Sequence, residues 1–273
     1  MKITKIKAPV KGQISTYFIA GDWHIDHMDW PAFDIMLKTA RKFFKNKKDR
    51  KLIINGDFLD AAHLMARNPM FKQWIKRSDG MDDYFIPTSE EELALGNRIL
   101  DLLQKDFSEI IYVEGNHDWR YRDFMAKCPK DYAYNFDYRL KLGLTDRGIK
   151  VVNYNKWLDI GDNLSITHGM YHGSTCHKKH YEASGAKSVI FSHIHHVGCK
   201  AFQVRGNTHH VWSLPALCNL NPEYIKGRET NWSKGFGVIN LHSDSTFNFN
   251  IFQIWNNKLI LPNGKIIQGN QGG

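Results

Sequence analysis

Five short apolar runs, each ending in a cluster of Asp, Asn or His, constrain the fold of this 273-residue chain more than any other feature. The runs and the clusters that follow them are ISTYFIA before residues 21–24, KLIIN before 56–60, EIIYVE before 115–118, NLSIT before 168–169, and SVIFS before 193–196. Apolar runs of this length, bounded by turn residues, are typical of buried strands. In open α/β sheets, ligands bind outside the carboxyl ends of the strands. We therefore expect the five polar clusters to meet in one crevice.

Helical patterns separate these runs. The segment DWPAFDIMLKTARKFFKN has apolar residues at helical spacing and begins near Asp29, with a proline in its first turn. The segment TSEEELALGNRILDLLQKD opens with a capping box between Thr88 and Glu91. Two further helices are expected, one after Asp118 and one over residues 173–186. The C-terminal part of the chain is dominated by strand patterns, so the sequence predicts two stacked sheets with helices outside them.

The composition is that of a globular chain. Hydrophobic residues make up 42% and charged residues 24%, which is enough apolar surface for a sizeable core. We expect one domain over residues 1–265 and a disordered tail over 266–273, because GNQGG has almost nothing to bury. The apolar run near the N-terminus is too short for a signal peptide, and no stretch approaches the roughly 20 apolar residues of a membrane helix. We therefore expect no membrane partner. Four cysteines without CxxC pairing indicate a cytoplasmic location.

Seven side chains from the five clusters share a ligand chemistry of carboxylate, imidazole and amide, without thiolate. They are Asp22, His24, Asp57, Asn116, His168, His193 and His195. Such ligands suit divalent manganese, iron or zinc. Seven side chains exceed the needs of one ion but suffice for two if one carboxylate bridges. Each piece alone is weak, since GD and GN are common turn dipeptides. The order of all five clusters, each after an apolar strand, carries the inference.

The charge of such a site favours a phosphate. Two divalent cations, two carboxylates and a bridging hydroxide leave one net positive charge, which would attract a phosphate and stabilise the charge that develops on it. A two-metal site also lowers the pKa of bound water and holds both the attacking and the leaving oxygen.

The order of these motifs resembles that of the calcineurin-like metallophosphoesterases over about residues 16–197. The motifs are Asp22-x-His24, Gly56-Asp57-x-x-Asp60, Gly115-Asn116-His117-Asp118, His168-Gly169 and His193-x-His195. The resemblance implies an α/β fold, a four-layer αββα sandwich of two mixed β-sheets flanked by helices. It also implies a first metal on Asp22, His24 and His195, a second on Asn116, His168 and His193, and a bridging Asp57. The chain is similar to stand-alone phosphoesterases related to the DNA-repair nucleases of this family.

The resemblance gives two further residues a catalytic role. His117 is implied as the general acid that protonates the leaving oxygen, and Asp60 as the carboxylate that orients it. Asp118 is expected to cap the helix that follows. The chain also departs from the family pattern at two positions. Ser192 stands where the family usually has glycine, and Ala61 stands where the phosphoprotein phosphatases of the family carry an arginine that holds phosphate. The second departure weakens a protein-phosphatase interpretation.

Basic residues raise the question of a polyanionic partner. The net charge is +9, and seven of the eleven residues 41–51 are Lys or Arg. For that run we favour the solvated end of a helix over a polyanion-binding surface. Residues 61–87 mix basic and aromatic side chains, which fits a nucleic-acid contact and an irregular packed helix equally well.

Two further groups of residues follow the motifs. Arg120 and Arg122, just past the acid, are expected to bind the substrate phosphate, with surface ion pairing as the alternative. A second group follows the ligand His168 and consists of His172, Cys176, His177 and His180. Its spacing matches no zinc finger, so a substrate-lining or solvated helix is favoured.

The sequence therefore predicts a dinuclear-metal-dependent phosphoesterase. The expected reaction is hydrolysis of phosphodiesters of nucleic acid or nucleotides by a metal-bridging hydroxide, with His117 as general acid. Manganese is the expected metal, with iron or zinc as alternatives, and DNA or RNA are the candidate partners. Two other functions stay open: a phosphomonoesterase acting on phosphoproteins or small metabolites, and a metal-binding interaction module without catalysis. The presence of His117 together with Asp60 argues against the second.

Overall fold

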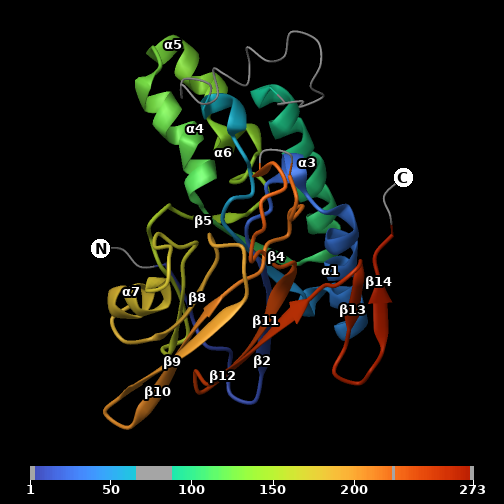
Figure 1. Cartoon of the computed structure of the whole chain (residues 1–273), viewed down its shortest axis with the longest axis vertical. Helices are drawn as coiled ribbons and strands as arrows, with labels where there is room; N and C mark the ends of the chain where they lie inside the picture. Colours follow the sequence, from blue (N-terminus) through green and yellow to red (C-terminus); the bar gives the residue numbers. More distant parts are fainter. Residues whose placement is uncertain (1–3, 66–87, 223–224, 271–273) are drawn as a thin grey trace.

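Two six-stranded sheets lie face to face in the computed structural model, which describes residues 4–65, 88–222 and 225–270 (Figure 1). The first sheet has the order β1(Thr4–Ile6), β6(Leu158–Ile160), β7(Leu164–Ile166), β8(Ser188–Phe191), β10(Asn207–Ser213), β9(Gly198–Val204). The second has the order β12(Phe247–Gln253), β11(Gly235–His242), β2(Ile14–Ala20), β3(Lys51–Asn55), β4(Glu109–Val113), β5(Lys150–Val152). Strands β2 to β5 are mutually parallel, whereas β11 and β12 join antiparallel, so the sheet is mixed.

Alternate residues of the strands pack into different layers, because successive side chains point to opposite faces. In β3, Ile53 packs between the sheets, whereas Leu52 and Ile54 pack against the helices. In β8, Ile190 packs between the sheets and Phe191 packs outward beside Tyr181 of helix α7(Cys176–Ala183).

The helices complete the outer layers. Helices α1(Trp30–Phe43) and α3(Ser89–Asp106) cover the second sheet, and α7 covers the first (Figure 1). Within the described residues, the other α-helices are α4(Asn116–Lys127), α5(Lys130–Ala133) and α6(Tyr138–Lys141). The four layers confirm the predicted αββα sandwich.

The helix ends follow the local sequence signals. The Asp29 carboxylate accepts a hydrogen bond from the Ala32 N–H at 2.9 Å, which caps α1. The capping box of α3 forms as predicted: Thr88 Oγ1 accepts from Glu91 N–H, and the Glu91 carboxylate accepts from Thr88 N–H. Helix α7 is shorter than the expected 173–186. In the part of the chain that the structure describes, no helix has the length and apolarity needed to span a bilayer.

The basic run 41–51 lies at the amino-terminal edge of the second sheet. Arg41 and Arg50 both bind the Asp106 carboxylate, at 2.6 and 3.1 Å. Lys51 opens β3, whose other end leads to Asp57. At about 3.3 Å per residue, Lys51 and Asp57 lie roughly 20 Å apart along the strand. The run therefore serves a helix end and internal ion pairs, and it does not border the polar clusters.

The expected disordered tail is wrong for residues 266–270. Strand β14(Ile266–Gln268) pairs with β13(Lys258–Ile260), and Asn270 N–H donates to the Asp34 carboxylate at 2.8 Å. Lys38 Nζ adds a bond to the Gln268 carbonyl. These contacts, together with the burial of Ile267 in the core, hold the segment on α1. Residues 271–273 lie outside the described chain.

Candidate metal centre

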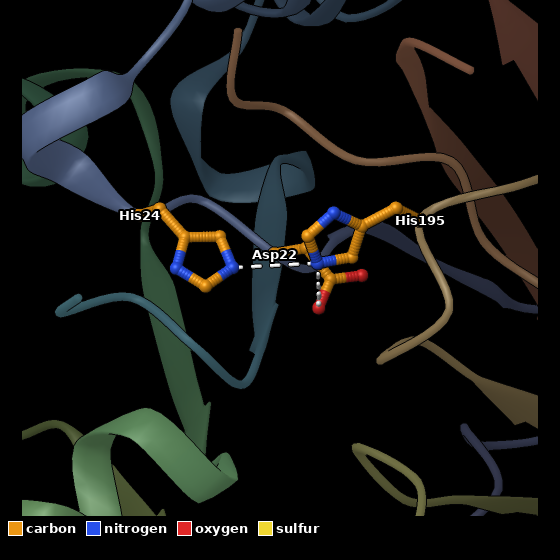
Figure 2. Close-up of side chains that lie close together, drawn as sticks. All are labelled: Asp22, His24 and His195. Carbon is orange, nitrogen blue, oxygen red and sulfur yellow. Dashed lines mark hydrogen bonds and ion pairs between the residues drawn. The ribbon is translucent and has the colours of Figure 1, made fainter. Parts of the chain in front are cut away.

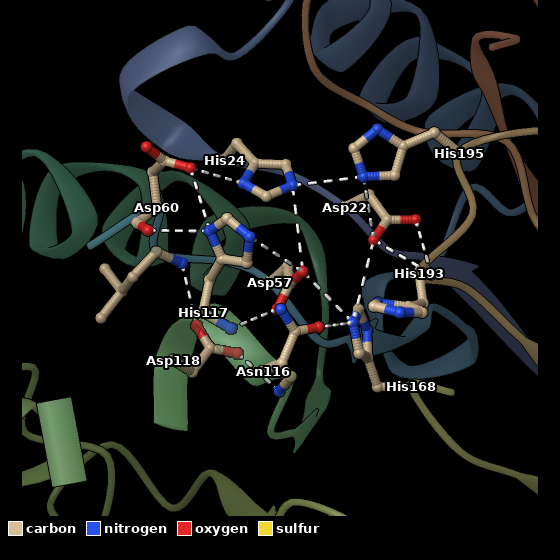
Figure 3. A network of polar contacts seen from close by, with 12 residues as sticks. Asp22, His24, Asp57, Asp60, Asn116, His117, Asp118, His168, His193 and His195 are labelled. Atoms are coloured by element: carbon tan, nitrogen blue, oxygen red, sulfur yellow. Dashed lines mark hydrogen bonds and ion pairs between the residues drawn. The ribbon is translucent and has the colours of Figure 1, made fainter. Parts of the chain in front are cut away.

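The structure brings the seven predicted ligand side chains into one cluster where the two sheets meet (Figure 3). Each side chain comes from the carboxyl end of a strand, three strands from the second sheet and two from the first. The placements are Asp22 and His24 after β2, Asp57 after β3, Asn116 after β4, His168 after β7, and His193 and His195 after β8. All nine residues from 16 to 24 are buried, as in a core strand, yet the segment includes the ionisable side chains of Asp22 and His24.

Five of these seven residues have a left-handed backbone. The φ angles are 51° at Asp22, 38° at His24, 49° at Asp57, 74° at His193 and 59° at His195. Residues with side chains rarely adopt such angles, and strain of this kind concentrates at functional sites. Cross-strand hydrogen bonds hold the conformation: the Asp57 carbonyl accepts from both Trp23 N–H and His24 N–H at 2.9 Å.

A first group consists of Asp22, His24 and His195 (Figure 2). The Nε2 atoms of the two imidazoles are 3.4 Å apart, and His195 Nε2 lies 3.5 Å from Asp22 Oδ1. Burial lowers the pKa of both imidazoles and raises that of the Asp22 carboxyl to about 8. Two neutral nitrogen donors that face each other beside a buried carboxylate fit a divalent cation, which would restore the carboxylate charge.

A second group consists of Asp57, His168 and His193, with Asn116 beside it. His168 Nε2 lies 3.2 Å from Asp57 Oδ2 and 3.0 Å from Asn116 Oδ1. The other ring nitrogen, Nδ1, donates to the Asn55 carbonyl at 2.9 Å, which fixes the ring and directs Nε2 at the cluster. Burial lowers the pKa of His193 to about 4, so this imidazole is a neutral donor.

Asp57 lies between the two groups. Its Oδ2 is 3.2 Å from His168 Nε2 and 3.9 Å from His24 Nε2, while Oδ1 accepts from His117 N–H at 2.8 Å. Burial alone would raise the pKa of Asp57, but the neighbouring imidazoles of His168 and His117 hold it well below its usual range. Asp57 is thus a buried, ionised carboxylate within reach of donors from both groups.

Two glycines are required by this packing. A Cβ on Gly56, whose φ is +82°, would lie 2.3 Å from His168 Nδ1. A Cβ on Gly115 would lie 2.2 Å from Asp57 Oδ1. Both distances are far inside van der Waals contact, so any side chain at either position would displace a candidate ligand.

The Asp60 carboxylate supports two histidines. Its Oδ1 accepts from His117 Nδ1 at 3.1 Å, the contact that the family resemblance implies, and also from His24 Nδ1 at 2.8 Å. Burial opposes ionisation, but these two imidazoles hold the pKa of Asp60 well below its usual range. Asp60 therefore orients a candidate ligand as well as the candidate acid, a second contact that sequence reasoning missed.

Arg120 covers the outer nitrogen of His117. Its Nη2 donates to His117 Nε2 at 2.9 Å, and its Nη1 donates to the Asp60 carbonyl at 2.9 Å. Burial lowers the pKa of His117, whereas Asp57 and Asp60 raise it and produce a net rise. An arginine is always protonated, so in this arrangement His117 Nε2 accepts and the proton of the ring lies on Nδ1.

Arg122 and Asp118 have structural contacts. Arg122 pairs with the fully buried Glu114 at 3.1 Å, which favours the ion-pair alternative over the expected contact with phosphate. Asp118 accepts from Gly115 N–H at 2.8 Å at the start of α4, as expected for a capping residue, and from Tyr112 OH at 2.7 Å.

Glu92 is a buried residue of the site that sequence reasoning missed. Its Oε1 accepts from the N–H groups of Asp60 and Ala61 at 2.6 and 2.9 Å, and its Oε2 accepts from Tyr121 OH at 2.6 Å. Burial raises the pKa of Glu92. Glu92 holds the turn that carries Asp60. In the sequence, only its position on the inner face of an amphipathic helix distinguishes it from the neighbouring Glu91.

The two departures from the family pattern have structural counterparts. Ser192 Oγ accepts from Asn55 Nδ2 at 2.8 Å, so the hydroxyl links the two sheets behind the cluster. Ala61 is buried with φ of 50°, and its N–H is held by Glu92, so this position offers no group to a phosphate.

Of the additional His and Cys residues, Cys176, His177 and His180 are buried in the protein framework, whereas His172 is exposed and its ring centroid lies 6.4 Å from that of His193. His180 Nδ1 donates to the Cys176 carbonyl at 2.9 Å, Nε2 accepts from Met170 N–H at 3.2 Å, and the ring stacks on Phe191. His180 thus supports the segment that follows the candidate ligand His168. Among the described residues, the groups with metal-ligand spacing include none of this cluster. Most of the 61–87 segment lies outside the described residues, so its expected role is a prediction that stays open.

Residues 16–197 match the family model described as "Calcineurin-like phosphoesterase". The chain belongs to the calcineurin-like phosphoesterase family, whose members are metal-dependent hydrolases of phosphoesters. A comparison with curated protein sequences gave no match. Among solved structures, the chain is similar to wild-type Vps29 complexed with Zn²⁺ from Entamoeba histolytica, with 10% identity and a TM-score of 0.47, covering 93% of this chain and 98% of that chain. It is also similar to Vps29 from Chaetomium thermophilum, with 9% identity and a TM-score of 0.40, covering 88% and 97%.

Proposed function

We propose that this protein is a dinuclear-metal-dependent phosphodiesterase acting on nucleic acid or nucleotides. The observation that carries the proposal is the position of Asp57 between two groups of donors, with His117 beside it. In the proposed assignment, one cation is held by Asp22, His24 and His195, and the other by Asn116, His168 and His193. Asp57 contributes to both. The donors suit manganese, with iron and zinc as alternatives.

When bound, the two cations would withdraw charge from the phosphoryl oxygens and lower the pKa of a water molecule. The residues of the chain supply the rest of the reaction. The water oxygen forms a bond to phosphorus while the bond from phosphorus to the leaving oxygen breaks. His117 gives a proton from Nε2 to that oxygen, and Asp60 holds the opposite ring nitrogen so that the ring stays oriented.

Arg120 is the proposed phosphate-binding residue. In the absence of substrate its Nη2 is bonded to His117 Nε2, the atom that must donate the proton. A phosphate competes well for a guanidinium, because the two form charged, bidentate hydrogen bonds. Substrate binding would therefore draw Arg120 away from His117. The freed Nε2 would take up a proton from solvent, which Asp57 and Asp60 favour by raising the pKa of His117, and would then donate it to the leaving oxygen. Arg120→Ala is expected to raise KM for a diester, whereas Arg122→Ala, which removes a partner of Glu114, is expected to lower stability with little change in KM.

The proposal is tested with a substrate panel assayed with Mn²⁺, Fe²⁺ and Zn²⁺ in turn. The panel contains a dinucleotide, bis-p-nitrophenyl phosphate, p-nitrophenyl phosphate and a phosphopeptide. We expect turnover of the two diesters and little of the monoesters, and calorimetry should count two ions per chain. Preferential turnover of monoesters would identify a phosphomonoesterase. Metal binding without turnover of any substrate would identify an interaction module.

A further inference from the structure

Aromatic side chains flank the candidate metal centre on two sides. On one side, Trp119 of α4 lies against Tyr154, with ring centroids 6.0 Å apart. Trp119 is 38% exposed, a large fraction for a tryptophan, and Tyr154 is half-buried. Tyr154 follows β5 at the same sheet edge as the cluster. Burial, together with the Asp57 carboxylate, raises the pKa of its hydroxyl, which agrees with a position beside the cluster.

On the other side, Trp232 lies over His195, with ring centroids 4.3 Å apart. Its neighbour Ser233 fixes the backbone, because Ser233 N–H donates to the His195 carbonyl at 2.8 Å and Ser233 Oγ accepts from Val197 N–H at 2.9 Å. Trp232 is half-buried, so part of the ring surface remains available. Trp232 belongs to the region beyond residue 197, which the family motifs do not cover.

The strand order places these aromatic residues at opposite ends of the cluster. Trp232 comes just before β11, and Tyr154 comes just after β5, in a sheet ordered β11-β2-β3-β4-β5. Four strand spacings of about 4.8 Å separate the two flanks by roughly 19 Å. Asp22, Asp57 and Asn116 follow the three strands between them. A phosphate at the metal centre would thus have an aromatic surface on each side.

We propose that Trp232 on one side, and Trp119 with Tyr154 on the other, form two base-stacking subsites that hold the nucleosides flanking the scissile phosphate. This inference rests on the proposed phosphodiesterase function and specifies its substrate as a diester with a planar base on both sides. Stacking needs no hydrogen-bond code, so any base sequence would be accepted. A monoester could occupy only one of the two subsites.

Because Trp232 packs on His195, the experiment must distinguish a role in stacking on a base from a role in positioning a candidate metal ligand. A ring that only positions a metal ligand would affect metal affinity and would affect all substrates equally. A ring that stacks on a base would affect only substrates that carry a base on its side. The two roles therefore differ in their dependence on substrate and in their effect on Mn²⁺ binding.

The test compares Trp119→Leu and Trp232→Leu with the control Trp255→Leu, which changes a 70% exposed tryptophan beyond the end of β12. Four Mn²⁺-assayed substrates are used: a dinucleotide, a nucleoside 3′-methyl phosphate, a nucleoside 5′-methyl phosphate, and an aliphatic diester of glycerol. Thermal unfolding and Mn²⁺ calorimetry are measured for each variant. A further variant, Trp232→Phe, keeps an aromatic ring in place should Trp232→Leu fail to fold.

We expect each of the two Leu variants to raise KM for the dinucleotide by about 5- to 150-fold, the range that stacking on a base provides. The aliphatic diester should change little, Mn²⁺ affinity should be unchanged, and Trp255→Leu should match the wild type. Each single-base substrate should be sensitive to only one of the two variants, which also gives the strand direction.

Equal losses on the dinucleotide and the aliphatic diester, or no loss on either, would overturn the inference while leaving the proposed function in place. A fall in Mn²⁺ affinity with equal losses on all four substrates would assign Trp232 to positioning His195 instead. If the wild type hydrolysed none of these diesters, the proposed function itself would be wrong, and the inference would fall with it.

Discussion

The substitution Asp60→Asn tests the support of two histidines by one buried carboxylate. Asp60 Oδ1 lies 2.8 Å from His24 Nδ1 and 3.1 Å from His117 Nδ1. An asparagine keeps the size and one acceptor oxygen but loses the charge, so both hydrogen bonds lose their ionic character. The change should therefore weaken metal binding through His24 and weaken acid catalysis through His117.

The expected magnitudes follow from these two contacts. Removing a carboxylate behind a metal-bound histidine typically costs about 10- to 100-fold in metal affinity, or about 1.4 to 2.8 kcal/mol. Loss of general acid help costs about 10²- to 10⁴-fold in rate when the leaving oxygen is a poor one. A nitrophenolate departs without a proton, so its release should suffer much less.

The assay is Mn²⁺ calorimetry combined with turnover at saturating Mn²⁺, on an alkyl diester and on bis-p-nitrophenyl phosphate. His117→Ala is the matched comparison, because it removes the acid and leaves the contact between Asp60 and His24 in place. Asp60→Asn should lose both metal affinity and alkyl-diester turnover, whereas His117→Ala should lose only the second. Wild-type Mn²⁺ affinity in a folded Asp60→Asn protein would refute the role assigned to the contact with His24.

The remaining predictions concern the other parts of the site. Asp57→Asn should lose both ions in metal analysis, and retention of two tightly bound ions would contradict its shared position. His117→Ala should slow an alkyl diester far more than a nitrophenyl diester, and equal losses would assign it a holding role. Burial lowers the pKa of His180 to about 4, so its contribution to stability is present above pH 6.5 and is lost as the pH falls towards 4. His180→Gln should therefore flatten the pH dependence of the unfolding free energy over that range by on the order of 3 kcal/mol, and an unchanged slope would contradict this. The affinity of the His117→Ala protein for a nucleic acid should fall as the salt concentration rises. Adding Lys45→Ala or Lys48→Ala should leave the slope of log K against log[salt] unchanged, because both lysines lie at the edge of the sheet far from the cluster. A flatter slope would show that the nucleic acid contacts that edge.

The parts of the fold that could be predicted are those with a local cause. The runs that became β2, β3 and β4 are largely apolar segments, and each is followed by a glycine and then by Asp or Asn. Thr88 and Glu91 lie three residues apart, so their capping box is visible in the sequence. Strands β1, β5 and β6 were not predicted, because three residues carry too little periodicity to be recognised and none of these strands ends in one of the five polar clusters, as the equally short β7 does.

The supporting residues of the site could not be predicted, because their partners are distant in sequence. Glu92 binds the backbone of Asp60 from 32 positions away, and Asn55 meets Ser192 across 137 positions. Neither pairing leaves a periodic signal. Trp232 reaches His195 through a segment outside the matched motifs. Local sequence patterns predict where the strands end, whereas tertiary packing determines which residues support the side chains at those ends.

The left-handed backbone of the cluster explains why the ligand motifs can be recognised in the sequence, whereas the residues that stabilise them cannot. Asp57 must supply a ligand chemistry and also adopt a φ of 49°, and the adjacent Gly56 must leave room for His168. Few residue types meet both demands, so the strand ends draw repeatedly on glycine, aspartate, asparagine and histidine. Strain at these positions costs free energy, of order 1–3 kcal/mol for each residue. That cost is offset by hydrogen bonds to backbone groups, such as those from Trp23 and His24 to the Asp57 carbonyl. Any residue type can supply a backbone group, so the stabilising contacts impose no pattern on the sequence.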